Sequence, residues 1–230
     1  MRSPLCPLRP SCRLSNGRTT MLVKICGITR MADAEVAVRA GAEALGFVLW
    51  PESPRFIDAS RARTIVSSLP PFVTPVGVFV NQPIEVVRKI AGLVGLGAIQ
   101  LHGDESPSYA SEVARPIVKA LSLEAAAADG EVDRWPERVV LLLDAHDPAR
   151  RGGTGRTIDW SVAARVAARR RTILAGGLTP ENVAEAIARV KPFGIDVSSG
   201  VESSPGVKDR ALIEALFEAV HAISHDPARS

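Results

Sequence analysis

The chain has 230 residues, of which 46% are apolar and 23% are charged, so it can bury one sizeable core and has the composition of a globular protein. Its net charge of +3 comes from the first twenty residues, which hold four arginines and no acidic residue, and the remainder is close to neutral. This balance argues against nucleic acid or a membrane surface as a partner. No apolar run approaches the ~18 residues of a transmembrane helix.

The first segment, residues 1–20, differs from the rest of the chain. It is rich in proline, arginine and serine and has no hydrophobic period. An organelle transit peptide shares this composition, but we favour an upstream start codon, with Met21 as the natural first residue. We expect residues 1–20 to be disordered in either case, and residues 21–230 to form one barrel domain.

The three cysteines indicate a reducing compartment. Cys6 and Cys12 lie in the first segment and Cys26 lies in the body, which leaves neither a disulfide framework nor a set of metal ligands at useful spacing. We therefore expect a cytoplasmic protein without a metal.

From Met21 onward, short apolar runs alternate with helical patterns. The predicted strands span 22–26, 44–49, 74–79, 97–101, 116–120, 138–143, 171–174 and 193–197. The predicted helices span 31–40, 58–68, 83–93, 106–114, 124–134, 159–168, 180–190 and 208–223. Asp58 stands where a helix N-cap is expected, and Pro83 and Pro180 stand where a first-turn proline is tolerated.

This alternation predicts an α/β fold, a single-domain (β/α)8 TIM barrel. Eight strand–helix pairs in about 210 residues are sufficient for that fold, and near-continuous apolar strands are typical of a sheet that is covered on both faces. The alternative is a doubly wound open sheet, but no dinucleotide-binding fingerprint follows the first strand.

The first candidate for chemistry is Cys26, which ends the first predicted strand and precedes a glycine. Its alternative role is that of a small buried hydrophobic residue. As a base or nucleophile it would need a lowered pKa, since a free thiol titrates near ~8.5. Lys24 points the same way but one layer deeper, so we expect the backbone amides of the following turn to help the thiolate instead.

The second candidate is Asp144, at the end of the sixth predicted strand. An aspartate there often caps the next helix or bonds the turn. The next predicted helix begins well downstream, however, and the glycine-rich segment 145–158 is typical of a mobile lid. A carboxyl group beneath such a lid would have a raised pKa, as a general acid requires.

Two loops predict a phosphate site. Gly176 and Gly177 follow the seventh strand, and Ser199 and Gly200 follow the eighth. Small residues let backbone N–H groups approach an anion, and the loops after strands 7 and 8 commonly hold phosphate in barrels. The glycine-rich segment 152–156 could contribute or close over the ligand.

Two further side chains could bind substrate. Arg55 follows the second strand and could clamp a carboxylate with two hydrogen bonds, or it could be a solvated loop residue. His102 follows the fourth strand and could be a site residue or a structural histidine.

Taken together, these motifs resemble the N-(5′-phosphoribosyl)anthranilate isomerase family of tryptophan biosynthesis. The matching segments, in family order, are KICGIT (24–29), GFV-x-W-P-x-S-P-R-F-I (46–57), VGVFVN (76–81), IQLHGDE (99–105), LLLDA (141–145), GGTGRTIDW (152–160), LAGGLTPENV (174–183) and GIDVSSGVE-x-x-PGVKD (194–209). Any one of them is weak evidence, and the ordered set is specific.

The resemblance implies an intramolecular aldose–ketose isomerase that uses no cofactor. It implies that Cys26 is the general base and Asp144 the general acid. It further implies that Arg55 pairs with the substrate's anthranilate carboxylate and that the residues of the two glycine loops hold its phosphate.

Other functions remain open at this point. Another sugar-phosphate lyase, epimerase or bifunctional isomerase would carry the same phosphate loops, and a non-catalytic barrel that binds a phosphorylated ligand is a further alternative. We expect a phosphorylated small molecule as substrate and either a monomer or a homodimer.

Overall fold

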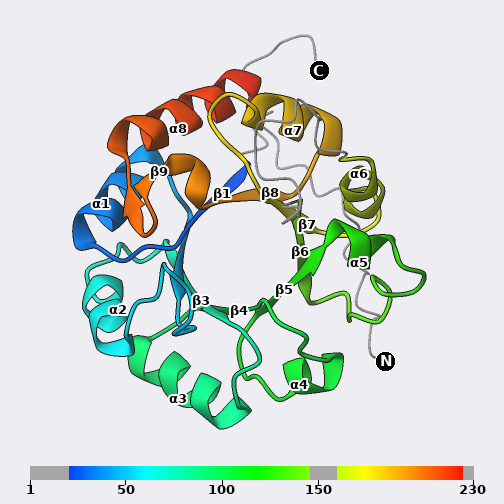
Figure 1. Cartoon of the computed structure of the whole chain (residues 1–230), viewed down its shortest axis with the longest axis horizontal. Helices are drawn as coiled ribbons and strands as arrows, with labels where there is room; N and C mark the ends of the chain where they lie inside the picture. Colours follow the sequence, from blue (N-terminus) through cyan, green and yellow to red (C-terminus); the bar gives the residue numbers. More distant parts are fainter. Residues whose placement is uncertain (1–20, 146–159, 225–230) are drawn as a thin grey trace, which may run out of the picture.

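A computed structural model describes residues 21–145 and 160–224, and in it eight parallel strands close into a barrel surrounded by helices (Figure 1). The strands are β1 (Leu22–Cys26), β2 (Ala44–Val48), β3 (Thr74–Phe79), β4 (Ala98–Leu101), β5 (Ile117–Ser122), β6 (Val140–Asp144), β7 (Thr172–Ala175) and β8 (Gly194–Val197). All eight lie within two residues of the strands predicted from the sequence. The predicted segments 1–20 and 152–156 lie outside the described residues.

The helices follow the strands in alternation. They are α1 (Met31–Ala40), α2 (Ala59–Val66), α3 (Ile84–Val94), α4 (Pro107–Ser111), α5 (Leu123–Ala127), α6 (Ser161–Ala167), α7 (Val183–Val190) and α8 (Arg210–Ser224). Asp58 caps α2 as expected, because its Oδ1 accepts hydrogen bonds from the N–H groups of Ser60 and Arg61. None of the helices in the described ranges is both long and apolar enough to cross a membrane.

The prediction of a helix over 124–134 is wrong, since α5 ends at Ala127. Gly130 has a φ of +76°, which a helix cannot contain. The carbonyl groups of Val132, Trp135, Pro136 and Val139 accept hydrogen bonds from Arg170. The guanidinium group therefore organises this segment as a series of turns.

Closure of the barrel settles the choice between the two predicted folds. β1 pairs in parallel with β2 on one side and with β8 on the other, where Val23 lies opposite Ile195. An open sheet would leave two of its strands with an unpaired edge, whereas each of these eight strands pairs on both sides. The (β/α)8 barrel is therefore confirmed, and the carboxyl ends of all eight strands meet at one rim.

The strands alternate between two environments. Outward residues such as Ile25, Phe47 and Leu141 are fully buried in the main core against the helices. Inward residues fill the barrel in small groups, among them Ala44, Val76 and Ala98. Cys26 and Asp144 occupy the inward-facing phase, two residues beyond Lys24 and Leu142 on their strands.

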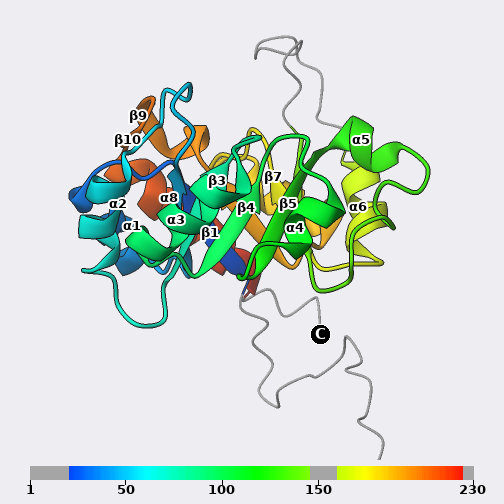
Figure 2. The same ribbon diagram turned by 90° about the horizontal axis from the view of Figure 1, so that it is seen from below.

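A short hairpin beyond β8 was not predicted. A 3-10 turn η1 (Ser199–Val201) leads into β9 (Glu202–Ser204), which pairs with β10 (Val207–Lys208). The hairpin lies at the upper edge of the barrel in Figure 2. Its turn is Pro205–Gly206, in which Gly206 has a φ of +78°. The proline–glycine pair was the sequence signal for this hairpin.

Candidate active site

The site lies at the rim formed by the carboxyl ends of the strands. Cys26 is the last residue of β1 and Asp144 the last residue of β6, while His102 directly follows β4. Gly176 directly follows β7, and Ser199 begins η1 just beyond β8. Closure of the barrel thus places on one rim residues that are far apart in the sequence.

Cys26 is buried among apolar side chains of neighbouring strands. Its thiol packs with Val48 and Val78, and Trp50 covers this group from the rim. We expected backbone N–H groups of the turn after Cys26 to stabilise its thiolate, and this is wrong for the N–H groups of Gly27 and Ile28. The N–H groups of Gly27 and Ile28 both donate to the Gly46 carbonyl oxygen, each at 2.9 Å. The turn therefore uses these donors to hold β1 against β2.

The expectation that Lys24 is too deep to act on Cys26 is also wrong. Burial raises the pKa of Cys26, and the charge of Lys24 is the largest influence that opposes this rise. The Lys24 ammonium group lies 2.8 Å from Asp196 Oδ2, and both side chains are almost completely shielded from water. A buried ion pair thus lies directly beneath the thiol.

Asp144 lines a cavity of about 630 Å³ together with His102, Asn81 and Lys119. Its Oδ2 lies 3.7 Å from Nε2 of His102. On the other side of the ring, Nδ1 lies 2.9 Å from Nε2 of Gln100. If that amide donates to Nδ1, the imidazole carries its hydrogen on Nε2, directed at Asp144. Cys26 is not among the residues that line this cavity.

The loop that carries His102 is fixed by a second buried ion pair, on the outer side of the barrel. Glu105 accepts hydrogen bonds from the N–H groups of Asn81 and Gly103. It also pairs with Lys119 at 3.0 Å, and Lys119 in addition donates to the carbonyl group of Gly103. These contacts hold together the loops that follow β3 and β4.

The two predicted phosphate loops lie against each other. A Cβ atom on Gly200 would stand 1.8 Å from the carbonyl oxygen of Leu178, so only glycine permits this approach. Gly176 and Gly177 have φ values of +89° and +66°. Asn182 holds the first loop, because its Nδ2 donates to the Gly177 carbonyl group and its Oδ1 accepts from the N–H of Thr179.

Four backbone N–H groups of these loops remain available to a ligand. Within the part of the chain that the structure describes, no hydrogen bond has the N–H of Gly176, Gly177, Ser199 or Gly200 as its donor. Unpaired N–H groups on two adjoining loops are what an anion-binding site requires.

α7 begins later than predicted, at Val183, so Asn182 rather than Thr179 precedes it.

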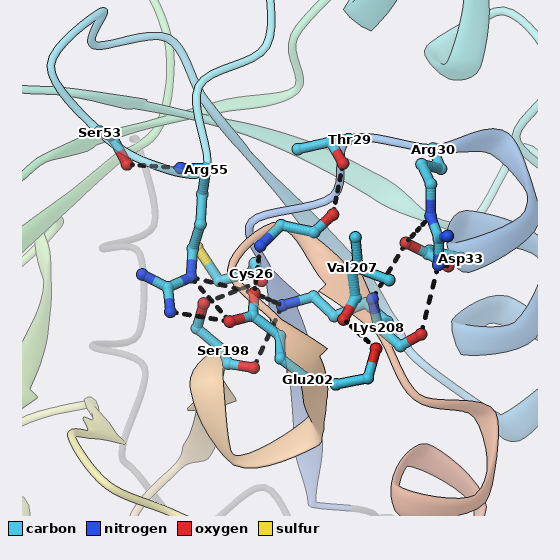
Figure 3. Close-up of polar contacts among 12 residues, drawn as sticks. Cys26, Thr29, Arg30, Asp33, Ser53, Arg55, Ser198, Glu202, Val207 and Lys208 are labelled. Carbon is cyan, nitrogen blue, oxygen red and sulfur yellow. Dashed lines mark hydrogen bonds and ion pairs between the residues drawn. The ribbon is translucent and has the colours of Figure 1, made fainter.

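Arg55 forms a two-pronged ion pair with Glu202 (Figure 3). Its Nε lies 3.0 Å from Oε1 and its Nη2 lies 2.7 Å from Oε2. Lys208 binds the same carboxylate at 2.8 Å and also donates to the Ser198 carbonyl group. Gly27 makes room for Arg55, since a Cβ there would stand 2.7 Å from Cδ of the arginine.

The sequence analysis missed three charged residues of the site, Asp196, Glu202 and Lys208, and it set Lys24 aside as too deep. Lys24 and Asp196 interrupt strands that are otherwise apolar, and a buried charge of this kind was the signal available for them. Glu202 and Lys208 reach the site only through the β9–β10 hairpin.

A closed (β/α)8 barrel with a thiol, a carboxyl group and two loops of unpaired N–H groups at its carboxyl-end rim has the arrangement of a barrel enzyme. Residues 23–219 match the family model "N-(5'phosphoribosyl)anthranilate (PRA) isomerase". The chain belongs to the N-(5′-phosphoribosyl)anthranilate isomerase family, as the resemblance of its motifs predicted. It is accordingly an isomerase of tryptophan biosynthesis.

Individual relatives agree with this assignment. The N-(5'-phosphoribosyl)anthranilate isomerase of Pelobacter propionicus is 48% identical over 196 residues, which cover 85% of this chain and 93% of the relative. The crystal structure of the Thermotoga maritima enzyme superposes with a TM-score of 0.80 at 40% identity, covering 88% of this chain and 99% of that one. A further family structure holds reduced 1-(o-carboxyphenylamino)-1-deoxyribulose 5-phosphate, with a TM-score of 0.76 at 39% identity and coverages of 88% and 99%.

Proposed function

We propose that the chain converts N-(5′-phosphoribosyl)anthranilate into 1-(2-carboxyphenylamino)-1-deoxyribulose 5-phosphate, with Cys26 as general base and Asp144 as general acid. The observation that carries this proposal is the position of both residues as the inward-facing ends of β1 and β6 in a barrel of this family. Membership of the family also favours this reaction over a lyase, an epimerase or a non-catalytic binding protein.

The reaction is an Amadori rearrangement, and its steps assign one proton transfer to each residue. Asp144 protonates the ribose ring oxygen, the ring opens, and a Schiff base forms at the anthranilate nitrogen. Cys26, as a thiolate, removes the proton from C2 and leaves an enolamine, which tautomerises to the ketone. The iminium group of the substrate accepts the electron pair, so the chemistry requires no cofactor.

His102 orients the acid in this scheme. Its Nε2–H, fixed by the Gln100 amide on Nδ1, approaches Oδ2 of Asp144. The other carboxyl oxygen can then carry the proton that is transferred to the ring oxygen. His102 also lines the cavity and can contact the substrate.

The two ends of the substrate are held by different groups. The phosphate receives hydrogen bonds from the N–H groups of Gly176, Gly177, Ser199 and Gly200. The anthranilate carboxylate pairs with Arg55, whose Nη1 has no bond to Glu202 and extends away from that carboxylate in Figure 3. Glu202 thus fixes the plane of the guanidinium group before substrate arrives.

Two substitutions test the assigned roles. Turnover is followed by the change in substrate fluorescence, and substrate binding is measured separately. Cys26→Ser and Asp144→Asn should each reduce turnover by several orders of magnitude while leaving binding nearly intact, because both keep the size of the side chain. Asp133→Asn, the same change at an exposed residue on the outside of the barrel, is the control. Full activity of either site variant would refute its role.

The remaining expectations concern assembly and location. A family structure is described as monomers generated from the dimeric Thermotoga maritima enzyme. The chain therefore acts as a homodimer or as a monomer, which light scattering of the purified protein distinguishes. A biosynthetic role and the cysteine usage favour a cytoplasmic location. Residues 21–230 form its single catalytic domain.

A further inference from the structure

Lys24 is a buried charge that the mechanism above does not use. The residue lies two positions before Cys26 on β1, so both side chains face the inside of the barrel. Its side chain is only 2% exposed, and its Nζ lies 2.8 Å from Asp196 Oδ2 on the neighbouring strand β8. Burial lowers the pKa of Lys24, but Asp196 and then Cys26 outweigh burial and hold that pKa above its ordinary value. Lys24 is therefore a cation inside the barrel.

The absence of a side chain at Gly46 lets the side chains of Lys24 and Cys26 approach each other. A Cβ atom on this glycine would stand 2.6 Å from Sγ of Cys26 and 3.0 Å from Nζ of Lys24. The sulfur and the ammonium nitrogen thus share the space that a side chain on β2 would otherwise fill. They can be no farther apart than the sum of those two lengths.

The charges around the thiol do not balance. Three cations, Lys24, Lys208 and Arg55, face two carboxylates, Asp196 and Glu202. Figure 3 shows Cys26 beside Arg55, Glu202 and Lys208. A thiolate at Cys26 would balance this set of charges, and Lys24 opposes the burial that holds the pKa of the thiol above its ordinary value. His102 and Asp144 are the titratable groups at the ends of β4 and β6, farther round the rim.

We propose that Lys24 is the counter-cation of the Cys26 thiolate, a positioning residue that stabilises the deprotonated sulfur from beneath while Asp196 holds its ammonium group in place. The inference rests on the proposed role of Cys26 as the base. The alternative is that the Lys24–Asp196 pair serves stability alone. The two explanations differ in what they predict for the titration of the thiol.

The two partners of the pair act on the thiol with opposite signs. Burial raises the pKa of Cys26, Lys24 lowers it, and Asp196 raises it. Loss of the Lys24 charge should therefore disfavour the thiolate, and loss of the Asp196 charge should favour it. A purely structural pair gives no reason for opposite shifts.

The titration is measured on the full chain with Cys6 and Cys12 replaced by serine, so that Cys26 is the single thiol. Thiolate absorbance in the ultraviolet is followed against pH, and the same protein with Cys26→Ser provides the blank. Lys24→Met should move the midpoint upward by about one pH unit or more, which is roughly tenfold less thiolate at a given pH below the midpoint. Asp196→Asn should move it downward.

Lys119→Met is the matched control. It removes the other buried lysine that pairs with a carboxylate, Glu105, on the outer side of the barrel. This variant should leave the midpoint of Cys26 in place. A Lys24→Arg variant, which keeps the positive charge, should restore a midpoint near that of the parent protein.

Two outcomes overturn the inference: an unchanged midpoint in Lys24→Met, or equal shifts in Lys24→Met and Lys119→Met. If Lys24→Met does not fold, because it leaves Asp196 unpaired, the double variant Lys24→Met/Asp196→Asn removes both charges. Its midpoint should still rise, since Lys24 acts on the thiol more strongly than Asp196 does. An unchanged midpoint there also overturns the inference.

The titration and the isomerase assay separate the two proposals. Opposite shifts of the midpoint, in a protein whose Cys26→Ser variant keeps full turnover, support the role of Lys24 and refute Cys26 as the base. Loss of turnover in Cys26→Ser, with no shift of the midpoint in Lys24→Met, supports Cys26 as the base and refutes the role of Lys24.

Discussion

Gly200→Ala tests the phosphate loops with a single methyl group. The added Cβ would stand 1.8 Å from the carbonyl oxygen of Leu178, 2.8 Å from its carbonyl carbon and 3.2 Å from Cα of Thr179. All three are backbone atoms, which cannot rotate away. Because optimal contacts between carbon atoms lie at ~3.5–4.0 Å, the loops after β7 and β8 must separate by roughly 1.5–2 Å.

The separation has a cost in stability and a cost in binding. Overpacking of this kind lowers the free energy of unfolding by about 1–3 kcal/mol. The N–H groups of Gly176 and Gly177 on one loop, and of Ser199 and Gly200 on the other, no longer converge on one anion. We therefore expect KM to rise by at least tenfold, with a smaller change in kcat, because the phosphate is held equally in the ground state and the transition state.

Gly92→Ala supplies the control. Gly92 lies within α3, and a Cβ there would meet nothing within 4 Å. The same substitution should stabilise the protein by about 0.5–1 kcal/mol and leave KM unchanged. Both variants are measured by urea unfolding, by isomerase kinetics and by inhibition with inorganic phosphate. The contact between the two loops would be refuted if Gly200→Ala had the same unfolding free energy, KM and phosphate inhibition constant as the parent protein.

Two more predictions concern the Arg55–Glu202 pair. Arg55→Lys should raise KM by about tenfold or more in steady-state kinetics, since a lysine cannot bind Glu202 and a substrate carboxylate in one plane; the same change at the exposed Arg210 of α8 is the control, and an unchanged KM would contradict the clamp. Burial raises the pKa of Glu202, but hydrogen bonds from Arg55 and Lys208 outweigh burial and hold it below its usual range. The stabilisation is therefore present above the unfolded-state pKa of about 4.3 and is lost as pH falls through the folded-state pKa. Unfolding by urea should thus show that Glu202→Gln is destabilised at neutral pH and that the difference from the parent protein shrinks on acidification; a difference that does not vary with pH would contradict this assignment.

The elements most accurately predicted were those with a continuous local signal. The strands of the barrel are apolar runs bounded by polar residues, and this pattern survives in any tertiary context. The segment 124–134 failed because its alanine-rich composition favours a helix, whereas Arg170, more than thirty residues away, binds its carbonyl groups. A contact at that distance in the sequence leaves no trace in local propensity.

The residues of the candidate site likewise fall into those that a local sequence signal identified and those that depend on contacts between distant segments. Cys26, Asp144 and the glycine loops were identified because each stands at the end of a strand, and a barrel brings strand ends together. The charges that surround the thiol were not identified. Lys24 was assigned no role, because its distance from the sulfur depends on the missing side chain of Gly46 on another strand. Arg55 was expected to bind the substrate or to be a solvated loop residue, and its bond to Glu202 depends on a hairpin that follows β8.

The sequence by itself determined the order of strands and helices, the closure that this order permits, and the chemical groups presented at the rim, because hydrophobic periodicity and turn residues act over a few positions. Only the tertiary structure decided which charged groups lie around the sulfur and how the two phosphate loops touch. Those features depend on distances of a few ångströms between strands far apart in the chain, and electrostatic and steric energies change steeply over that range.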